Sequence, residues 1–246
     1  MSGDMQIRQT TTGETERSPE GSVDQIVTKV VEYIRSHKLM PGDTLPSESE
    51  FARSFGVSRP VIREAYRALA SIRIIELHSG RRARVGHIAP DAMSQILTHG
   101  LMTEQIDRRD VYDIRRVLEA RIAFRAALQH SEEEARMLMR LARGMAEAID
   151  DPEAVMALDI EFHEHLAKCS RNPLFYLVIR SMRDVISETW PVGWRIRSSR
   201  ESKMAMIQNH VDLAQAVVDG DQEKAARLME LHFDSTENTL LKAGIL

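Results

Sequence analysis

The chain has 246 residues, of which 43% are hydrophobic and 28% are charged, and its formal net charge at pH 7 is −4. This composition is typical of a folded protein with one or two domains and excludes a disordered chain. The single cysteine, Cys169, excludes an internal disulfide framework and a cysteine-based zinc site. The sequence lacks the roughly 18 uninterrupted apolar residues of a membrane span and a secretion signal, so we expect a cytoplasmic protein without membrane contact.

The charge is distributed unevenly along the chain. Residues 23–88 hold 11 Lys and Arg against 7 Asp and Glu, whereas residues 89–246 hold 20 against 26. Phosphate backbones attract cations, so a nucleic-acid contact is expected in the earlier segment. We therefore predict a flexible tail over residues 1–21, which are almost free of apolar side chains, a DNA-binding domain over residues 22–88 and a helical domain over residues 89–246.

Residues 22–88 have the pattern of a winged helix-turn-helix. After a first helix, Ser47 and Glu50 form a capping box that opens a second helix. Gly56, which tolerates a positive φ, ends that helix, and Ser58 caps a third one. The spacing of a small residue at Ala52, a turn residue at Gly56 and an apolar anchor at Ile62 indicates a helix-turn-helix.

A basic surface follows from the third helix and the wing. Short strands over 74–77 and 82–85 flank a turn at Gly80, beside Arg81. One face of the third helix carries three arginines, which form either a solvated face or a DNA contact. The nearby basic wing favours DNA contact. The three arginines are Arg59, Arg63 and Arg67.

From residue 91 onward the sequence is helical almost to its end, as expected of a bundle with its own core. The breaks fall at Asp150 to Pro152, at Asn172-Pro173, at Trp190 to Gly193 and at Gly220. Seven helices are predicted, with spans of 91–102, 108–129, 132–149, 152–169, 173–189, 199–218 and 221–242.

Several polar residues of this bundle lie on apolar helix faces. Asp159 and His163 are one turn apart on such a face, and His210, His232 and Arg115 lie on the apolar faces of three other helices. Burying such groups without partners is costly, so they are either hydrogen-bonded core residues or a functional cluster. Three imidazoles and a carboxylate would suit a divalent metal such as Zn, Ni or Mn, and a buried arginine would bind a carboxylate.

Two sets of motifs resemble a known family. Pro41 to Asp43, Leu45 to Glu48, Phe55 to Arg59 and Arg63 to Ala65 resemble the DNA-binding domain of the GntR family of bacterial transcription factors. The later motifs resemble the FCD effector domain of FadR-type members. They are Asp113 to Glu119, Asp159, Phe162-His163, Asn172-Pro173, His210 to Asp221 and Met229 to His232.

The resemblance implies a mainly α protein with an N-terminal winged helix-turn-helix and a C-terminal all-α FCD-like bundle. It implies a homodimer on a palindromic double-stranded DNA operator. It also implies a metal held by Asp159, His163, His210 and His232, with a small carboxylate effector bound to this metal and to Arg115. The DNA-contacting residues expected are Ser58, Arg59, Arg63, Gly80 and Arg81, together with Arg53 or Arg67.

The sequence departs from the family pattern at two positions. Ser49 stands where many members have a DNA-contacting arginine, so Arg53 and Arg67 are the expected replacements. Arg171 stands where a glycine is commoner.

We therefore predict a metabolite-responsive DNA-binding regulator, a repressor of transcription whose effector is a sugar acid or hydroxy acid. Two other interpretations remain open. A metal-dependent hydrolase could use the same aspartate and histidines to activate water, although His163 and His165 flank Glu164 on different helix faces. An architectural DNA binder would not need polar groups inside the bundle.

Overall fold

The computed structural model describes residues 22–242, so the predicted tail over residues 1–21 lies outside the described part. Eleven helices and two short strands make up this part, which confirms the predicted mainly α fold. Contacts divide the chain into two compact units, the first ending at His87 and the second beginning at Ile88. None of the helices in this part combines the length and the hydropathy of a membrane span.

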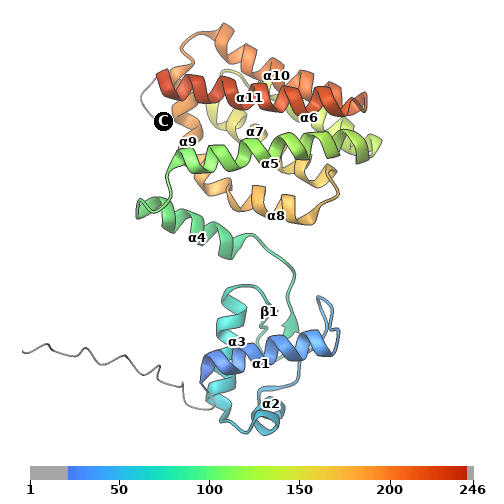
Figure 1. Cartoon of the computed structure of the whole chain (residues 1–246), viewed down its shortest axis with the longest axis vertical. Coiled ribbons are helices and arrows are strands. Elements are labelled where there is room, and N and C mark those ends of the chain that lie inside the picture. The colour runs from blue at the N-terminus through green and yellow to red at the C-terminus, as the bar shows by residue number, and fades with distance from the viewer. Residues whose placement is uncertain (1–21, 243–246) are drawn as a thin grey trace, which may run out of the picture. The chain divides into compact units, whose positions relative to one another are not determined.

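The first unit is a three-helix domain with a two-stranded wing (Figure 1). The strands are antiparallel, with Ile75 opposite Val85, and Thr44 adds a single bridge to Arg84. Apolar side chains of all three helices and both strands form one core, in which Ile26, Leu45 and Ile62 have no exposed surface. The elements are α1 Val23–Ser36, α2 Glu48–Phe55, α3 Arg59–Ser71, β1 Ile75–Glu76 and β2 Arg84–Val85.

The turn between α2 and α3 follows the sequence signals closely. Ser47 and Glu50 form the predicted capping box, with Glu50 N–H donating to Ser47 Oγ and Ser47 N–H donating to Glu50 Oε2. Gly56 ends α2 with a φ of 68° in the left-handed region. Ser58 occupies the N-cap position of α3, but its side chain makes no capping hydrogen bond. Ser58 therefore occupies the predicted cap position, but without the side-chain hydrogen bond expected of a cap.

The second unit is a bundle of eight helices. The central helix α7 packs against α5 and α6, and α10 packs against α6 and α11. Helix α11 lies along α5 for much of its length (Figure 1). The elements are α4 Asp91–Met102, α5 Arg108–Gln129, α6 Glu132–Glu147, α7 Pro152–Cys169, α8 Pro173–Ser181, α9 Arg183–Ile196, α10 Arg200–Val218 and α11 Gln222–Lys242.

The predicted single helix over residues 173–189 is wrong in two respects. The chain turns at Met182, whose N–H donates to Ile179 O at 3.1 Å, and this tight turn separates α8 from α9. Helix α9 then continues through Pro191 to Ile196. Trp190 and Trp194 stack one turn apart, with ring centroids 5.1 Å apart, and Trp194 is buried. This packing outweighs the local tendency of proline to end a helix.

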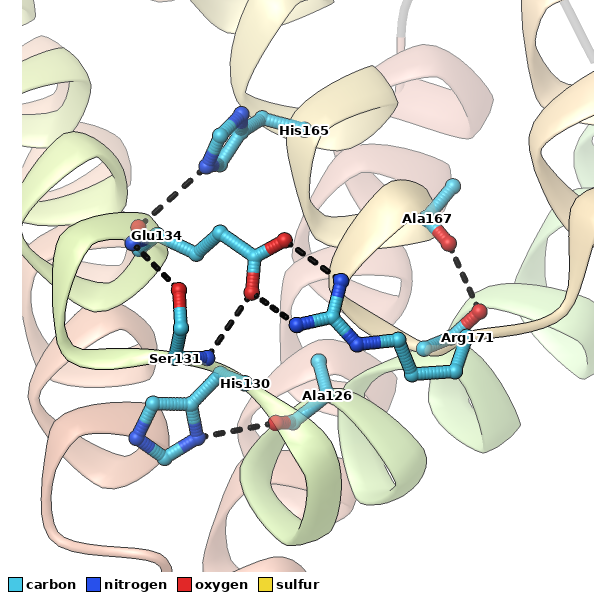
Figure 2. Close-up of polar contacts among 8 residues, drawn as sticks. Ala126, His130, Ser131, Glu134, His165, Ala167 and Arg171 are labelled. Carbon is cyan, nitrogen blue, oxygen red and sulfur yellow. Dashed lines mark hydrogen bonds and ion pairs between the residues drawn. The ribbon is translucent and has the colours of Figure 1, made fainter.

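The turn between α7 and α8 contains the unusual Arg171. Its φ is 56°, in the region where glycine is favoured. Its guanidinium donates two hydrogen bonds of 2.7 Å to Glu134, the residue that forms a capping box with Ser131 at the start of α6 (Figure 2). Nε2 of His165 on α7 also lies 3.2 Å from the backbone oxygen of Glu134. The ion pair thus ties the strained turn to α6.

Candidate functional site

The first unit holds a hollow of about 320 Å³ beside the helix-turn-helix. It is bordered by the start of α2, the start of α3 and the wing. Three of the predicted DNA-contacting residues, Arg59, Gly80 and Arg81, line it together. Gly80 has a φ of 69° at the tip of the wing. The structure therefore brings the start of α3 and the wing tip to one basic hollow.

Arg63 lies next to this hollow and is already paired. Its Nε and Nη2 atoms donate to the Glu48 carboxylate at 3.2 and 2.9 Å, and Arg59 Nη2 lies 3.9 Å from the same carboxylate. The hydrogen bond from Arg63 lowers the pKa of Glu48. Glu48 at the start of α2 therefore hydrogen-bonds Arg63 and lies within ion-pair distance of Arg59, both on α3.

The remaining predicted DNA residues lie outside the hollow. Arg53 donates to Ser49 O on its own helix at 3.4 Å, and Arg67 pairs with Glu64 at 2.8 Å. Both arginines are exposed. The hydroxyl of Ser58 is left uncommitted by the missing cap bond and is exposed at the start of α3.

In the second unit, three histidines from three helices converge. Nitrogen atoms of His163 on α7, His210 on α10 and His232 on α11 all lie within 4.8 Å of one another. Nitrogen ligands about 2.0–2.1 Å from one zinc ion lie within roughly 4.2 Å of each other, so small side-chain rotations would bring these atoms to a common ion. Asp159 joins them, with Oδ1 3.0 Å from His210 Nε2.

The hydrogen bonds of the rings turn their other nitrogen atoms toward the cluster. His210 Nδ1 lies 3.0 Å from Met206 O, and His163 Nδ1 contacts Glu119 Oε2. Because both partners are acceptors, each Nδ1 atom donates and each Nε2 atom faces the cluster. His163 Nε2 is buried without a hydrogen-bond partner among residues 22–242, and His210 Nε2 faces the Asp159 carboxylate at 3.0 Å.

The charge states of these residues also suit a cation. Burial acts to raise the pKa of Asp159, but the nearby imidazoles, above all His210, outweigh it and hold this pKa well below its usual value. Burial lowers the pKa of His232, and the other two imidazoles lower it further. The cluster therefore offers an ionised carboxylate and a neutral imidazole, which are the forms that bind divalent metals.

Arg115 lies beside the histidine cluster, and its guanidinium is bound by a carboxylate of its own helix. Its Nε donates to Glu119 Oε1 at 2.6 Å, and both side chains are almost fully buried. Burial acts to raise the pKa of Glu119, but the charge of Arg115 and the hydrogen bonds from Arg115 and His163 outweigh it and lower this pKa. One carboxylate of α5 therefore connects the arginine to the histidine cluster.

A small cavity of about 40 Å³ reaches this group of side chains. Arg115, Asp159 and His232 line one part of it, and Trp190 and Trp194 line another. The structure thus brings the predicted effector-binding arginine and two predicted metal ligands to one cavity. It also places Trp190 and Trp194, whose role the sequence does not indicate, on the same cavity.

Sequence reasoning missed two residues of this site. Glu119 lies four positions after Arg115 on the same helix, so the spacing of oppositely charged residues could have identified it. Arg197, which also lines the cavity, follows the end of α9 and lies outside any helical periodicity. Only the folded arrangement reveals it.

The carboxylate of Glu164 is hydrogen-bonded to two arginines. It accepts hydrogen bonds from Arg180 Nη1 at 2.6 Å and Arg183 Nε at 2.7 Å. A carboxylate held in this way is poorly suited to act as a general base for a metal-bound water. The geometry gives no support to the hydrolase interpretation.

Comparisons with known proteins agree with both units. Residues 22–85 match the family described as bacterial regulatory proteins, gntR family, and residues 110–235 match the FCD domain. The chain is 26% identical over 219 residues to the HTH-type transcriptional repressor NanR of Salmonella newport, covering 88% of this chain and 84% of the repressor. NanR of Salmonella typhimurium is similar at the same identity.

A solved structure, the Streptococcus agalactiae GntR protein, is similar along most of its length. The TM-score is 0.64 at 25% identity, and the alignment covers 88% of this chain and 99% of that protein. The matched families and these relatives are DNA-binding regulators of transcription and not enzymes. The chain therefore belongs to the GntR family of bacterial transcriptional regulators, in the branch whose second domain is an FCD effector-binding domain.

Proposed function

We propose that this regulator is a repressor that binds a palindromic operator as a homodimer and is released by a small carboxylate. The carboxylate, a sugar acid or hydroxy acid, would bind at a divalent metal site in the FCD domain. The observation that carries this proposal is the convergence of three histidines and Asp159 in one cluster, beside a cavity that Asp159, His232 and Arg115 line. The NanR relatives, which are named repressors, support the sign of regulation.

The metal would be held by Asp159, His163, His210 and His232, and would serve as a positively charged anchor for a carboxylate. The unpartnered Nε2 atom of His163, and the Nε2 atom of His210 that faces the Asp159 carboxylate, support this ligand set. Arg115, which lines the same cavity, would orient the carboxylate, and Glu119 would hold both Arg115 and His163 in place.

The test of the metal site is elemental analysis of purified protein. The double variant His210→Ala, His232→Ala should lose the bound metal, and the control His165→Ala, which changes a histidine outside the cluster, should retain it. Full metal occupancy in the double variant would refute the site.

The small size of the cavity supports a conformational role for the effector. About 40 Å³ accommodates a few water molecules and not a sugar acid. A sugar acid would require the helices around the cavity to separate, and it would favour the arrangement of the bundle that accommodates it. An effector changes DNA affinity only through such a difference in affinity for two states.

The DNA contact would involve Ser58, Arg59, Arg63, Gly80 and Arg81, with Arg53 and Arg67 as further contacts. Genomic fragments recovered by the purified protein would supply an operator for fluorescence anisotropy. Arg63→Ala should weaken operator binding without changing the metal content. Effector-dependent release in the same assay separates this proposal from an architectural DNA binder, which would remain bound.

The homodimer is supported by an apolar stripe on α5. Ile114, Val117 and Leu128 have 52%, 71% and 54% of their surfaces exposed, at positions that repeat along one face. Asp113 and Arg121 lie on either side of Val117, so two antiparallel copies of α5 would pair opposite charges. Such a self-complementary face suits a twofold interface.

Light scattering during size-exclusion chromatography tests this interface. Val117→Asp should convert the dimer to a monomer, whereas Leu231→Asp, which changes a residue of α11 that is 57% exposed, should leave the dimer intact. A monomeric native protein, or a dimeric Val117→Asp variant, would contradict the proposal.

A further inference from the structure

The buried guanidinium of Arg197 has no acidic partner. Only 8% of this residue is exposed. Its Nη1 donates to Gly193 O at 3.0 Å and its Nη2 donates to Thr236 Oγ1 at 3.3 Å, and both acceptors are neutral. Within residues 22–242, no carboxylate oxygen lies within 4.0 Å of it. A buried charge without a direct counter-ion destabilises a protein.

Arg115, on the same cavity, is in the opposite situation. Its charge is balanced by Glu119 at 2.6 Å. The remaining carboxylate of the cavity, Asp159, lies against His210. The two arginines that line the cavity therefore differ, because only Arg197 has a positive charge that no direct contact neutralises.

A second unpaired donor lines the same cavity. Trp194 is 3% exposed, and its indole Nε1 is buried without a hydrogen-bond partner among the described residues. Trp194 and Arg197 are one turn apart and both line the cavity with Thr236. A buried N–H without an acceptor costs free energy, and a bound acceptor would recover it.

We infer that Arg197 and Trp194 bind a second acidic group of the effector, so that the effector is a hydroxy or sugar acid with two acidic groups. This inference rests on the proposed carboxylate-responsive function. A count of charges supports it. Arg115 and Arg197 balance Glu119 and Asp159, so a divalent cation at the histidine cluster leaves two positive charges in the cavity. A dianionic ligand neutralises both charges, whereas a monocarboxylate neutralises one.

A ligand-free experiment tests the difference between the arginines. The melting temperature of the bundle can be followed by tryptophan fluorescence, because Trp190 and Trp194 are the only tryptophans of the chain. Arg197→Met removes a buried charge that has no direct ion-pair partner and should raise the melting temperature by a few degrees, whereas Arg115→Met leaves Glu119 without its ion-pair partner and should lower it. A decrease in both variants would overturn the inference.

A matched pair of probes tests the second acidic group. L-Malate is L-lactate with one carboxylate added. The melting temperature of zinc-loaded protein is measured with each acid at equal concentration and ionic strength. Malate should bind about tenfold more tightly than lactate, which corresponds to a melting temperature roughly 3–6 °C higher. Arg197→Met should abolish the difference. The control Lys203→Gln, which changes a lysine over the Trp194 ring, should preserve it.

Each result has a separate meaning. Equal shifts with malate and lactate, or a malate advantage that survives in Arg197→Met, would overturn the second acidic group and leave the proposed function intact. If neither acid raises the melting temperature, the carboxylate-responsive function itself fails.

Discussion

Replacing Glu119 with glutamine tests whether the connection between the arginine and the histidine cluster is as buried as the structure indicates. The carboxylate of Glu119 accepts from Arg115 Nε and contacts His163 Nδ1, and only 1% of this residue is exposed. Glu119→Gln preserves the shape of the side chain and removes its charge. Arg115, with 7% of its side chain exposed, cannot turn to water. The substitution therefore leaves a buried guanidinium without a counter-ion.

The magnitude follows from the burial of the partners. Breaking a buried ion pair by removing one charge costs about 3–5 kcal/mol. Glu164→Gln is the matched control, because Glu164 is also buried and also accepts from arginines. Its partners Arg180 and Arg183 have side chains that are 39% and 40% exposed, so water can solvate them. The control should cost about 1–2 kcal/mol, because half-exposed ion pairs contribute little each.

The assay is urea denaturation followed by tryptophan fluorescence, which reports on the bundle alone because both tryptophans lie there. A chelator keeps metal from contributing to stability. The denaturation midpoint should fall further for Glu119→Gln than for Glu164→Gln, with unchanged slopes. If Glu119→Gln costs no more than Glu164→Gln, the argument from burial is wrong.

Other predictions concern stability. Gly56→Ala places a side chain at a φ of 68° with no atom within 4 Å, so it should cost roughly 1–2 kcal/mol in chemical denaturation. Arg171→Gly should be more stable than Arg171→Ala by about 1 kcal/mol, since both lose the ion pair and only glycine relieves the positive φ. Burial raises the pKa of Cys169 to about 12, so a thiol reagent should label it only in unfolded protein. Burial acts to raise the pKa of Glu134, but hydrogen bonds from Ser131 and Arg171 outweigh it and lower this pKa. The stability that Glu134 contributes is thus present above about pH 4.3 and is lost on further acidification, and Glu134→Gln should flatten that part of the acid unfolding profile.

The fold was predictable where local signals coincide with packing. The capping box at Ser47 and the left-handed Gly56 are determined by short-range chemistry, and both are present as expected. The prediction failed at Trp190 and Pro191, because proline indicates a helix end only when tertiary contacts do not oppose it. The stacking of Trp190 on the buried Trp194 keeps α9 helical there. Such packing depends on residues of other helices that no local pattern reveals.

The candidate site was predictable to the extent that its residues lie on helix stripes. Asp159 and His163 were identifiable because each polar group interrupts an apolar face, and the structure places both at the centre of the bundle. Arg197 follows the end of α9, where no periodicity separates a buried from an exposed side chain. Its burial depends on Gly193 and Thr236, which belong to different helices.

The shared use of Glu119 has a consequence for regulation. One oxygen of this carboxylate binds Arg115, and the other contacts His163, a proposed metal ligand. A ligand carboxylate at Arg115 would compete for the same charge, and a metal on His163 would strengthen the hydrogen bond to Glu119. If the proposed function holds, the occupancies of the metal and effector sites would therefore be coupled through a single buried side chain. Because such coupling is reciprocal, the effector would change the affinity for the metal by the same factor by which the metal changes the affinity for the effector.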